Sequence, residues 1–189
     1  ETNGQRIRDA ILTEAALLAT IEGLDGLSIG GLATATGLSK SGLYAHFGSK
    51  EDLQLATIAS ARDTFIAEVI TPALAAEPGI QRVRAACEAF LSHIERRVFP
   101  GGCFFAVAAA DVGTRPGPVR DAVGAQQRDW ITFLEKQIRT GLPQQDDDPA
   151  QLAFELNAVL VAASTAFVLQ GDPAVFDRAR RAVSRRIQG

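Results

Sequence analysis

The stretch that decides the fold is residues 37–53, which read GLSKSGLYAHFGSKEDL. Ser39 is a preferred helix N-cap and Gly48 is a stop signal, so a helix of under ten residues is expected between them. Its only inward apolar pair is Leu43 and Phe47, at i and i+4, and the other side chains are small or can form hydrogen bonds. Because such a helix buries little, its sequence is best explained as a surface element.

Two further helices precede this stretch. The first carries apolar residues at spacings of three and four, and residues 23–26 end it with two glycines. Ser28 caps the second helix, and Gly37 ends it. Two short helices joined by Thr36-Gly37-Leu38 have the length and turn chemistry of a helix-turn-helix, whose second helix enters the DNA major groove. From spacing alone, an ordinary corner in a helical bundle remains open as the alternative.

Gly and Pro divide the rest of the chain into helices as well. Ser49 and Asp52 form an approximate capping box for a long fourth helix, which Pro72 is expected to kink or end. Further helices are expected over 80–99, 103–112 and 119–140, then from Asp146-Asp147-Asp148-Pro149 to Gly171, and from Asp172-Pro173 to Ile187. The expected fold class is therefore all-α, with nine helices.

The charge balance argues against DNA binding through an overall positive electrostatic field of the protein. The chain has 47% hydrophobic and 22% charged residues, a globular composition, and a net charge of −3. Residues 1–55 hold four basic and seven acidic residues, which again gives −3. Any affinity for DNA must therefore come from the local placement of a few cations and backbone amides.

Taken together, these motifs resemble the signature of TetR-type transcriptional regulators, over roughly residues 5–55. The matching residues are Ile11-Leu12, Ala15-Ala16, Gly23, Gly26, Leu32-Ala33, Gly37 to Tyr44, His46-Phe47 and Gly48 to Leu53. The resemblance implies a helix-turn-helix DNA-binding domain over 1–50, which we call the head. It also implies a ligand-binding and dimerisation domain over 51–189, which we call the body. It implies a cytoplasmic regulator of operator DNA, expected to be a repressor.

The resemblance also implies roles for individual residues. Lys40, Ser41 and Gly42 occupy base-reading positions, Tyr44 meets the DNA backbone, and Ser28 and Lys50 contact phosphates. His46 is either a phosphate contact or a packed or capping histidine. The DNA-binding candidates are Ser28, Ser39, Lys40, Ser41, Gly42, Tyr44, His46 and Lys50. The chain departs from the family pattern at Gly30 and Gly31, which weaken the second helix by about 1 kcal/mol each relative to Ala.

The last two helices, about 149–187, are implied by the resemblance to pair with their copies in a homodimer. The segment Leu152 to Leu169 is apolar nearly all round, which suits burial on two sides. A central core helix in a monomer is the alternative. A membrane span is not favoured, because the segment lacks Lys and Arg flanks and contains polar residues. The arginines of the last helix are interpreted as a solvated face.

An effector pocket is expected among the helices of the body. The candidate lining residues are Phe65, Phe90, Phe104, Phe105, Trp130 and Phe133, for which plain core is the alternative. The short apolar helix at 103–112 has small side chains that leave room and few charges. The sequence therefore predicts a small apolar or aromatic effector.

Other chemistry has little support in the sequence. Cys87 and Cys103 are interpreted as reduced, packed thiols, with a regulatory disulfide as the alternative. The two histidines, His46 and His93, have no Cys at zinc-ligand spacing, so no metal or cofactor is expected. No signal peptide is visible, and no nucleophile has a base beside it, so an enzyme is not favoured. A helical small-molecule carrier whose head no longer reads DNA remains the alternative function.

Overall fold

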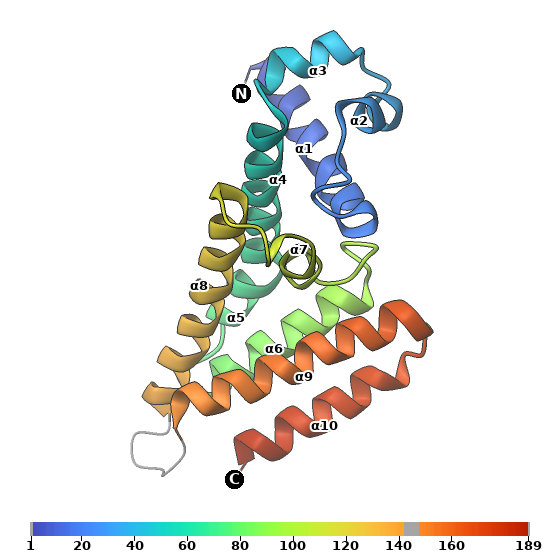
Figure 1. Ribbon diagram of the computed structural model, residues 1–189. Helices are drawn as coiled ribbons and strands as arrows, with labels where there is room; N and C mark the ends of the chain where they lie inside the picture. Colours follow the sequence, from blue (N-terminus) through green and yellow to red (C-terminus); the bar gives the residue numbers. More distant parts are fainter. Residues whose placement is uncertain (1, 142–147, 189) are drawn as a thin grey trace. The chain divides into compact units, whose positions relative to one another are not determined.

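The computed structural model describes residues 2–141 and 148–188, and the regular elements in these ranges are all helical (Figure 1). In chain order they are α1 Asn3–Glu22, α2 Ile29–Thr36, α3 Lys40–His46, α4 Lys50–Phe65, η1 Ile66–Ile70, α5 Thr71–Leu74, α6 Ile80–Glu95, α7 Phe104–Val112, α8 Pro118–Gly141, α9 Pro149–Gln170 and α10 Ala174–Gln188. When α4, η1 and α5 are counted as one continuous helix, the described ranges hold nine helices. The all-α prediction is confirmed.

Two expected helix ends differ from the structure. The fifth predicted helix was expected to reach Phe99, but α6 ends at Glu95. Arg97 adopts a left-handed backbone with φ 52°, which an α-helix cannot continue through. Pro72 does not end its helix: the chain widens to a π-helical turn over η1 just before it and continues as α5 to Leu74.

The predicted start of α9 is confirmed where the structure describes it. The Asp148 side chain accepts a hydrogen bond from the Ala150 amide at 2.9 Å, and Pro149 takes the first helical position. Asp146 and Asp147 lie outside the described residues.

The chain folds into two compact units. The first consists of Glu1–Thr64 and Phe99–Ala125. Within it α1 packs against α2 and α7, and α2 packs against α3. Buried aliphatic and aromatic side chains form its core, among them Ile11, Leu24, Leu32, Leu43, Phe47, Leu53 and Phe104. The α7 segment therefore completes the core of a three-helix head that is too small to bury much on its own.

A glycine allows the α7 segment to approach α1 closely. The Gly101 amide donates to the Thr20 hydroxyl at 3.1 Å. A Cβ atom at Gly101 would lie 1.8 Å from the Thr20 carbonyl oxygen, so no larger residue fits without a backbone shift.

The second unit consists of Phe65–Val98 and Gln126–Gly189, and α6, α9 and α10 pack against one another in it (Figure 1). Helix α9 has one buried row and one exposed row of apolar residues. Its buried residues are Leu152, Ala153, Leu156, Leu160, Ala163, Ser164 and Phe167. On the opposite side, Phe154 is 65% exposed and Leu169 is 78% exposed. By length and composition α9 could cross a membrane, but its buried row is part of the core of this unit.

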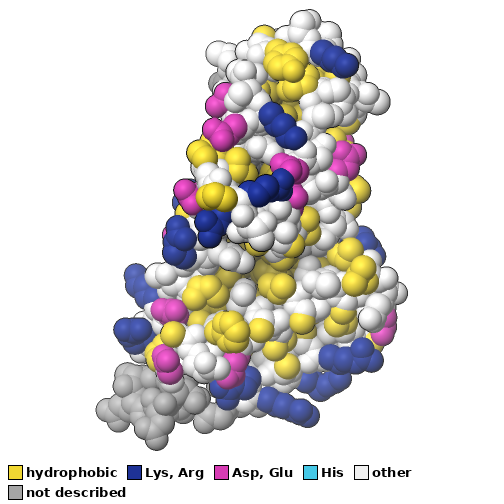
Figure 2. Space-filling model, viewed as in Figure 1, with side chains coloured by type: hydrophobic (Ala, Val, Ile, Leu, Met, Phe, Trp, Pro, Cys, Tyr) yellow, Lys and Arg dark blue, Asp and Glu magenta, His cyan; other side chains and the backbone are white. Residues whose placement is uncertain are grey.

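Helix α10 carries the arginine run, and Figure 2 shows the cationic side chains gathered along it. Arg178, Arg181 and Arg185 are exposed, which fits the predicted solvated face. Two others are ion-paired within the unit. Arg180 contacts Glu88 at 2.8 Å and Glu95 at 3.1 Å, and Arg186 pairs with Glu155 of α9. The hydrogen bonds that Arg180 donates to Glu88 and Glu95 raise the pKa of its guanidinium.

Candidate nucleic-acid interface

Helix α2 begins at a serine cap, as predicted. The Ser28 hydroxyl oxygen accepts a hydrogen bond from the Gly31 amide at 2.9 Å. Gly37 ends the helix in the left-handed conformation, with φ 68°. A serine hydroxyl that accepts one amide still has its own proton to donate. Ser28 can therefore cap α2 and donate to a phosphate at the same time.

Helix α3 repeats this arrangement. The Ser39 hydroxyl accepts from the Gly42 amide at 3.1 Å and lies 3.2 Å from the Ser41 hydroxyl. Leu43 is completely buried, whereas Tyr44 is 58% exposed. The seven-residue helix therefore anchors one apolar side chain in the core and presents its polar residues, including Lys40 and Ser41, to solvent.

The C-terminal end of α3 is held by Arg8, which the sequence did not single out. The Arg8 guanidinium donates to the His46 carbonyl oxygen at 2.5 Å and lies over the Phe47 ring, 4.5 Å from its centroid. A cation at this end complements the helix dipole and satisfies a terminal carbonyl. The half-buried His46 ring lies 6.3 Å from that of Phe47, so His46 contributes to the packed end of α3.

Lys50 is exposed at the start of α4, and its ammonium group donates to the Asp25 carbonyl oxygen. An ammonium has three protons, so this bond leaves two for a phosphate. The Ser49 cap of α4 is present: the Asp52 amide donates to the Ser49 hydroxyl at 3.0 Å. The Ser49 hydroxyl in turn donates to the Asp52 carboxylate at 2.7 Å, which is the predicted capping box in a modified form.

The two unusual glycines of α2 lie beside different neighbours, Gly30 beside the Lys40 side chain and Gly31 beside the Ser28 cap. A Cβ atom on Gly30 would lie 3.6 Å from the Lys40 Cε atom and 3.8 Å from its Nζ atom. The Lys40 side chain therefore lies along α2 with its ammonium group near the first turn of that helix. A Cβ atom on Gly31 would lie 3.2 Å from the Ser28 hydroxyl oxygen, which is tight for the cap.

The first unit thus presents two short capped helices joined through a left-handed glycine, the second with its polar face in solvent. Residues 11–57 match the model of the bacterial regulatory proteins of the tetR family, and residues 79–183 match that of the tetracyclin repressor-like C-terminal domain.

The chain belongs to the TetR family.

Solved structures of TetR regulators have the same fold. A regulator from Chloroflexus aurantiacus J-10-FL is 24% identical with a TM-score of 0.91, covering 100% of this chain and 97% of that one. A TetR-family regulator from Agrobacterium tumefaciens is 22% identical with a TM-score of 0.86, covering 97% and 98%. AibR, solved with isovaleryl coenzyme A and operator DNA, is 23% identical with a TM-score of 0.76, covering 94% and 96%. No curated protein matches the sequence.

The six predicted effector-binding aromatics fall into two groups. Phe65, Phe90, Trp130 and Phe133 form a chain of ring contacts in the second unit, with centroids 5.3 to 6.2 Å apart. The Trp130 indole also donates to the Asn157 amide oxygen at 3.0 Å. Phe104 and Phe105 contact each other in the first unit, with centroids 5.1 Å apart.

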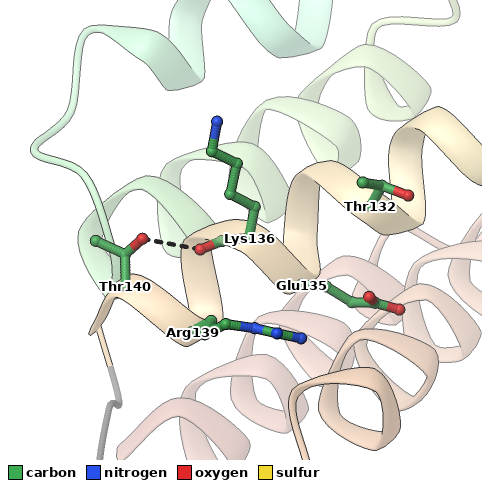
Figure 3. Close-up of a pocket in the computed structure, with 5 residues that line it drawn as sticks. All are labelled: Thr132, Glu135, Lys136, Arg139 and Thr140. Carbon is green, nitrogen blue, oxygen red and sulfur yellow. Dashed lines mark hydrogen bonds between the residues drawn. The ribbon is translucent and has the colours of Figure 1, made fainter.

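A surface hollow of about 350 Å³ on α8 differs from the predicted effector site. The described side chains that line it all belong to α8, and they are Thr132, Glu135, Lys136, Arg139 and Thr140 (Figure 3). The Thr140 hydroxyl donates to the Lys136 carbonyl oxygen at 2.9 Å, a bond within the helix. The lining is charged and hydroxylic, which does not suit an apolar effector.

Both cysteines are buried, which disfavours their reactive thiolate form. Cys87 and Cys103 are buried free thiols in different units. Burial raises the pKa of the Cys87 thiol to about 12, and burial also raises the pKa of Cys103. A thiol must ionise to react, so the raised pKa values disfavour reaction of either thiol at neutral pH. Among the described residues, no three His, Cys, Asp or Glu side chains gather as a metal site.

Proposed function

We propose that the protein is a homodimeric repressor that binds operator DNA through α2 and α3 and is released by a small apolar or aromatic effector. In this proposal residues 1–50 are the DNA-binding domain and residues 51–189 bind the effector and form the dimer, in the cytoplasm. The DNA contacts are Ser28, Ser39, Lys40, Ser41, Gly42, Tyr44, His46 and Lys50.

The observation that carries the proposal is the two-sided character of α3. A helix with Leu43 fully buried and Tyr44 58% exposed is fixed in the core yet free on its polar side. Its side chains there are small enough for close approach to a groove, and Lys40 can reach a base edge or a phosphate. Because the whole head carries seven acids against four bases, binding depends on these few placed groups.

The exposed row of α9 supports the homodimer. Phe154 and Leu169 lie at its two ends, and the small exposed residues Ala158, Ala162 and Thr165 lie between them at spacings of three and four. A continuous apolar row along a 22-residue helix is unfavourable in water and suits a copy of itself across a twofold axis.

The aromatic chain around Trp130 supports the effector's chemistry. Phe65, Phe90 and Trp130 are buried in contact with one another, and the Asn157 amide is a polar group beside them. An effector that entered among these rings would meet the mostly apolar surroundings with a few placed polar atoms that are typical of small-molecule sites. The structure of AibR contains both isovaleryl coenzyme A and operator DNA, so one protein of this fold binds a small molecule and DNA together.

Two alternatives are weaker. A small-molecule carrier would not need a capped α3 with its polar face in solvent. An enzyme would need an activated nucleophile, and the burial that raises the pKa of Cys87 and Cys103 works against one.

The first test is binding of the purified protein to the DNA upstream of its own gene, followed by fluorescence anisotropy over a salt series with excess random competitor. We expect saturable binding that survives the competitor, with two protomers per duplex or a multiple of two. If this duplex binds no better than random DNA, selection from a random-sequence pool follows. Failure to enrich any sequence would refute a DNA-binding regulator and leave the carrier. Quenching of the single Trp then screens apolar compounds for those that also release the duplex.

A further inference from the structure

We infer that Arg115 and Asp111, which lie outside the DNA-binding helices, are positioning residues for DNA binding, because they hold the turn between α1 and α2 through Asp25. The inference rests on the proposed function, since it concerns the orientation of the helices that read DNA. All the residues involved belong to the first unit.

Asp25 is bound at each of its polar groups. Its amide donates to an Asp111 carboxylate oxygen at 3.0 Å, and its carboxylate pairs with the Arg115 guanidinium. Its carbonyl oxygen accepts from the Lys50 ammonium group. Arg115 also binds Asp111, through the carbonyl oxygen at 2.6 Å and the carboxylate at 3.1 Å. We call this set of four residues the Asp25 clamp.

The clamp joins three segments that are distant in sequence. Asp25 lies between α1 and α2, Lys50 begins α4, and Asp111 and Arg115 lie at and just after the end of α7. Beside Asp25, the Leu24 carbonyl oxygen accepts from the buried Gln54 amide at 2.8 Å, which ties the same turn to α4 a second time. These bonds tie the turn to both α4 and α7.

Polar bonds make this connection in addition to the packing of buried Leu24 and Val112. A hollow of about 140 Å³ lies among the three segments, and Asp25, Gln54, Val112 and Arg115 are among its lining residues. The Arg115 side chain is 47% exposed and that of Asp25 is 51% exposed, so one isolated pair would contribute little. Arg115 instead binds two carboxylates, and one of these also accepts a hydrogen bond from a backbone amide. Such a network fixes the orientation of its side chains more strictly than a single ion pair does.

The turn that contains Asp25 leads directly into the start of α2. Ser28, the cap of α2 and a proposed phosphate contact, follows Asp25 by three residues, and Lys50, another proposed phosphate contact, holds Asp25 directly. Loss of Arg115 would free the Asp25 carboxylate and loosen this geometry without removing a DNA contact. This predicts weaker binding with unchanged counterion release.

The test uses full-length protein and a duplex selected by the wild type from a random-sequence pool. Arg115→Ala is compared with Arg120→Ala, which removes an exposed cation five residues further along. We expect Arg115→Ala to weaken binding about fivefold, equivalent to about 1 kcal/mol. The slope of log affinity against log salt concentration, here called the salt slope, should stay that of the wild type. Arg120→Ala should bind as the wild type does, and Arg115→Lys should recover part of the loss.

A double-mutant cycle identifies the partner. Asp25→Asn and Arg115→Ala are measured singly and together, and the double variant should lose no more than the worse single variant. Independent, additive losses would overturn the clamp. So would a reduced salt slope in Arg115→Ala, which would make Arg115 a phosphate contact.

A readout without DNA separates this inference from the proposed function. Tyr44 of α3 is the only tyrosine in the chain, so 3-fluorotyrosine gives a single ¹⁹F resonance from the recognition helix. Arg115→Ala should shift or broaden it, and Arg120→Ala should leave it unchanged. If the wild type selects no duplex, the proposed function fails while the resonance still decides on the clamp. An identical resonance in Arg115→Ala would overturn it.

Discussion

The guanidinium of Arg8, in the second turn of α1, donates a hydrogen bond to the carbonyl oxygen of His46, the last residue of α3, at 2.5 Å. The two residues are separated by 38 positions in the sequence, so the bond fixes the end of the recognition helix to the first helix of the head. A seven-residue helix has little stability of its own, so such tertiary contacts determine whether it forms.

Replacing Arg8, which is half-buried, should therefore destabilise the protein. Arg8→Ala removes the hydrogen bond to His46 and the contact with the Phe47 ring, and we expect a loss of about 1–2 kcal/mol in the free energy of unfolding. Urea denaturation measures it. Arg6→Ala, an exposed arginine on the same helix, should change stability by less than about 0.5 kcal/mol. Equal effects of the two variants would contradict the role of Arg8.

Lys50 and Lys40 should differ in how they affect DNA binding. Lys50→Ala should weaken binding to all duplexes alike and reduce the slope of log affinity against log salt by about one, because one phosphate contact is lost. Lys40→Ala should instead change which sequences are enriched from a random pool. Anisotropy over a salt series and sequence selection measure the two effects. An unchanged salt slope in Lys50→Ala would remove Lys50 from the phosphate contacts.

Buried His93 should make stability depend on pH between about 4 and 6.5. Burial lowers the pKa of His93 from 6.5 to about 4, while Glu68 raises it and Arg96 lowers it further. As pH falls through 6.5 the unfolded chain binds a proton that the folded protein does not, so stability is lost between pH 6.5 and 4. The lowered pKa limits this loss to about 3 kcal/mol.

Denaturant titrations at pH 7.5 and 4.5 measure the contribution of His93. His93→Gln should reduce the difference in unfolding free energy between the two pH values. His46→Gln removes the other histidine and keeps His93, so the difference should remain. A His93→Gln protein with the full wild-type difference would assign the pH dependence to other groups.

The two thiols should be unreactive in the folded protein. Because Cys87 and Cys103 are buried and their pKa values are raised, a thiol reagent such as DTNB at pH 8 should label neither within minutes, and both should react in denaturant. Rapid labelling of one thiol under native conditions would show that its surroundings open, and would restore the regulatory disulfide as a possibility.

A charge on the exposed row of α9 should separate the dimer. Phe154→Glu places a carboxylate where the proposed interface requires an apolar contact, and we expect the mass in solution to fall from two chains to one. Sedimentation or light scattering measures it. Ile21→Glu changes an equally exposed apolar residue on α1, 66% against 65%, and should leave the dimer intact. Dimers of unaltered stability in Phe154→Glu would place the interface elsewhere.

The parts of the fold that the sequence predicts are the local ones. Ser28, Ser39 and Ser49 cap their helices as expected, and Gly37 is left-handed at the end of α2, because caps and glycine turns depend on residues within three or four positions. The expected all-α class and the TetR resemblance are confirmed. The early end of α6 was missed because Arg97, a residue with no preference for the left-handed region, adopts it there.

The interactions that hold the candidate interface together were not predictable, because they are long-range and involve ordinary charged residues. Arg115 and Asp25 are 90 positions apart, and Arg8 and His46 are 38 apart. Nothing in the local sequence distinguishes Arg115 from a solvated arginine. Arg8 alone carried a weak signal, since a cation one turn into an apolar-striped helix can reach a neighbouring element. The DNA contacts themselves remain a prediction.

The use of cations inside the head has a consequence for copy number. Residues 1–55 carry four basic residues, and two of them, Arg8 and Lys50, already donate to backbone carbonyl oxygens. Affinity for DNA of arbitrary sequence comes from phosphate contacts, and the chromosome supplies far more arbitrary sites than operators. Under the proposed function, a head with only four cations, two of which also hold the head itself together, should leave little of the protein bound to arbitrary DNA. A small number of molecules per cell should then be enough to keep an operator occupied, and each one that the proposed effector releases should stay in solution.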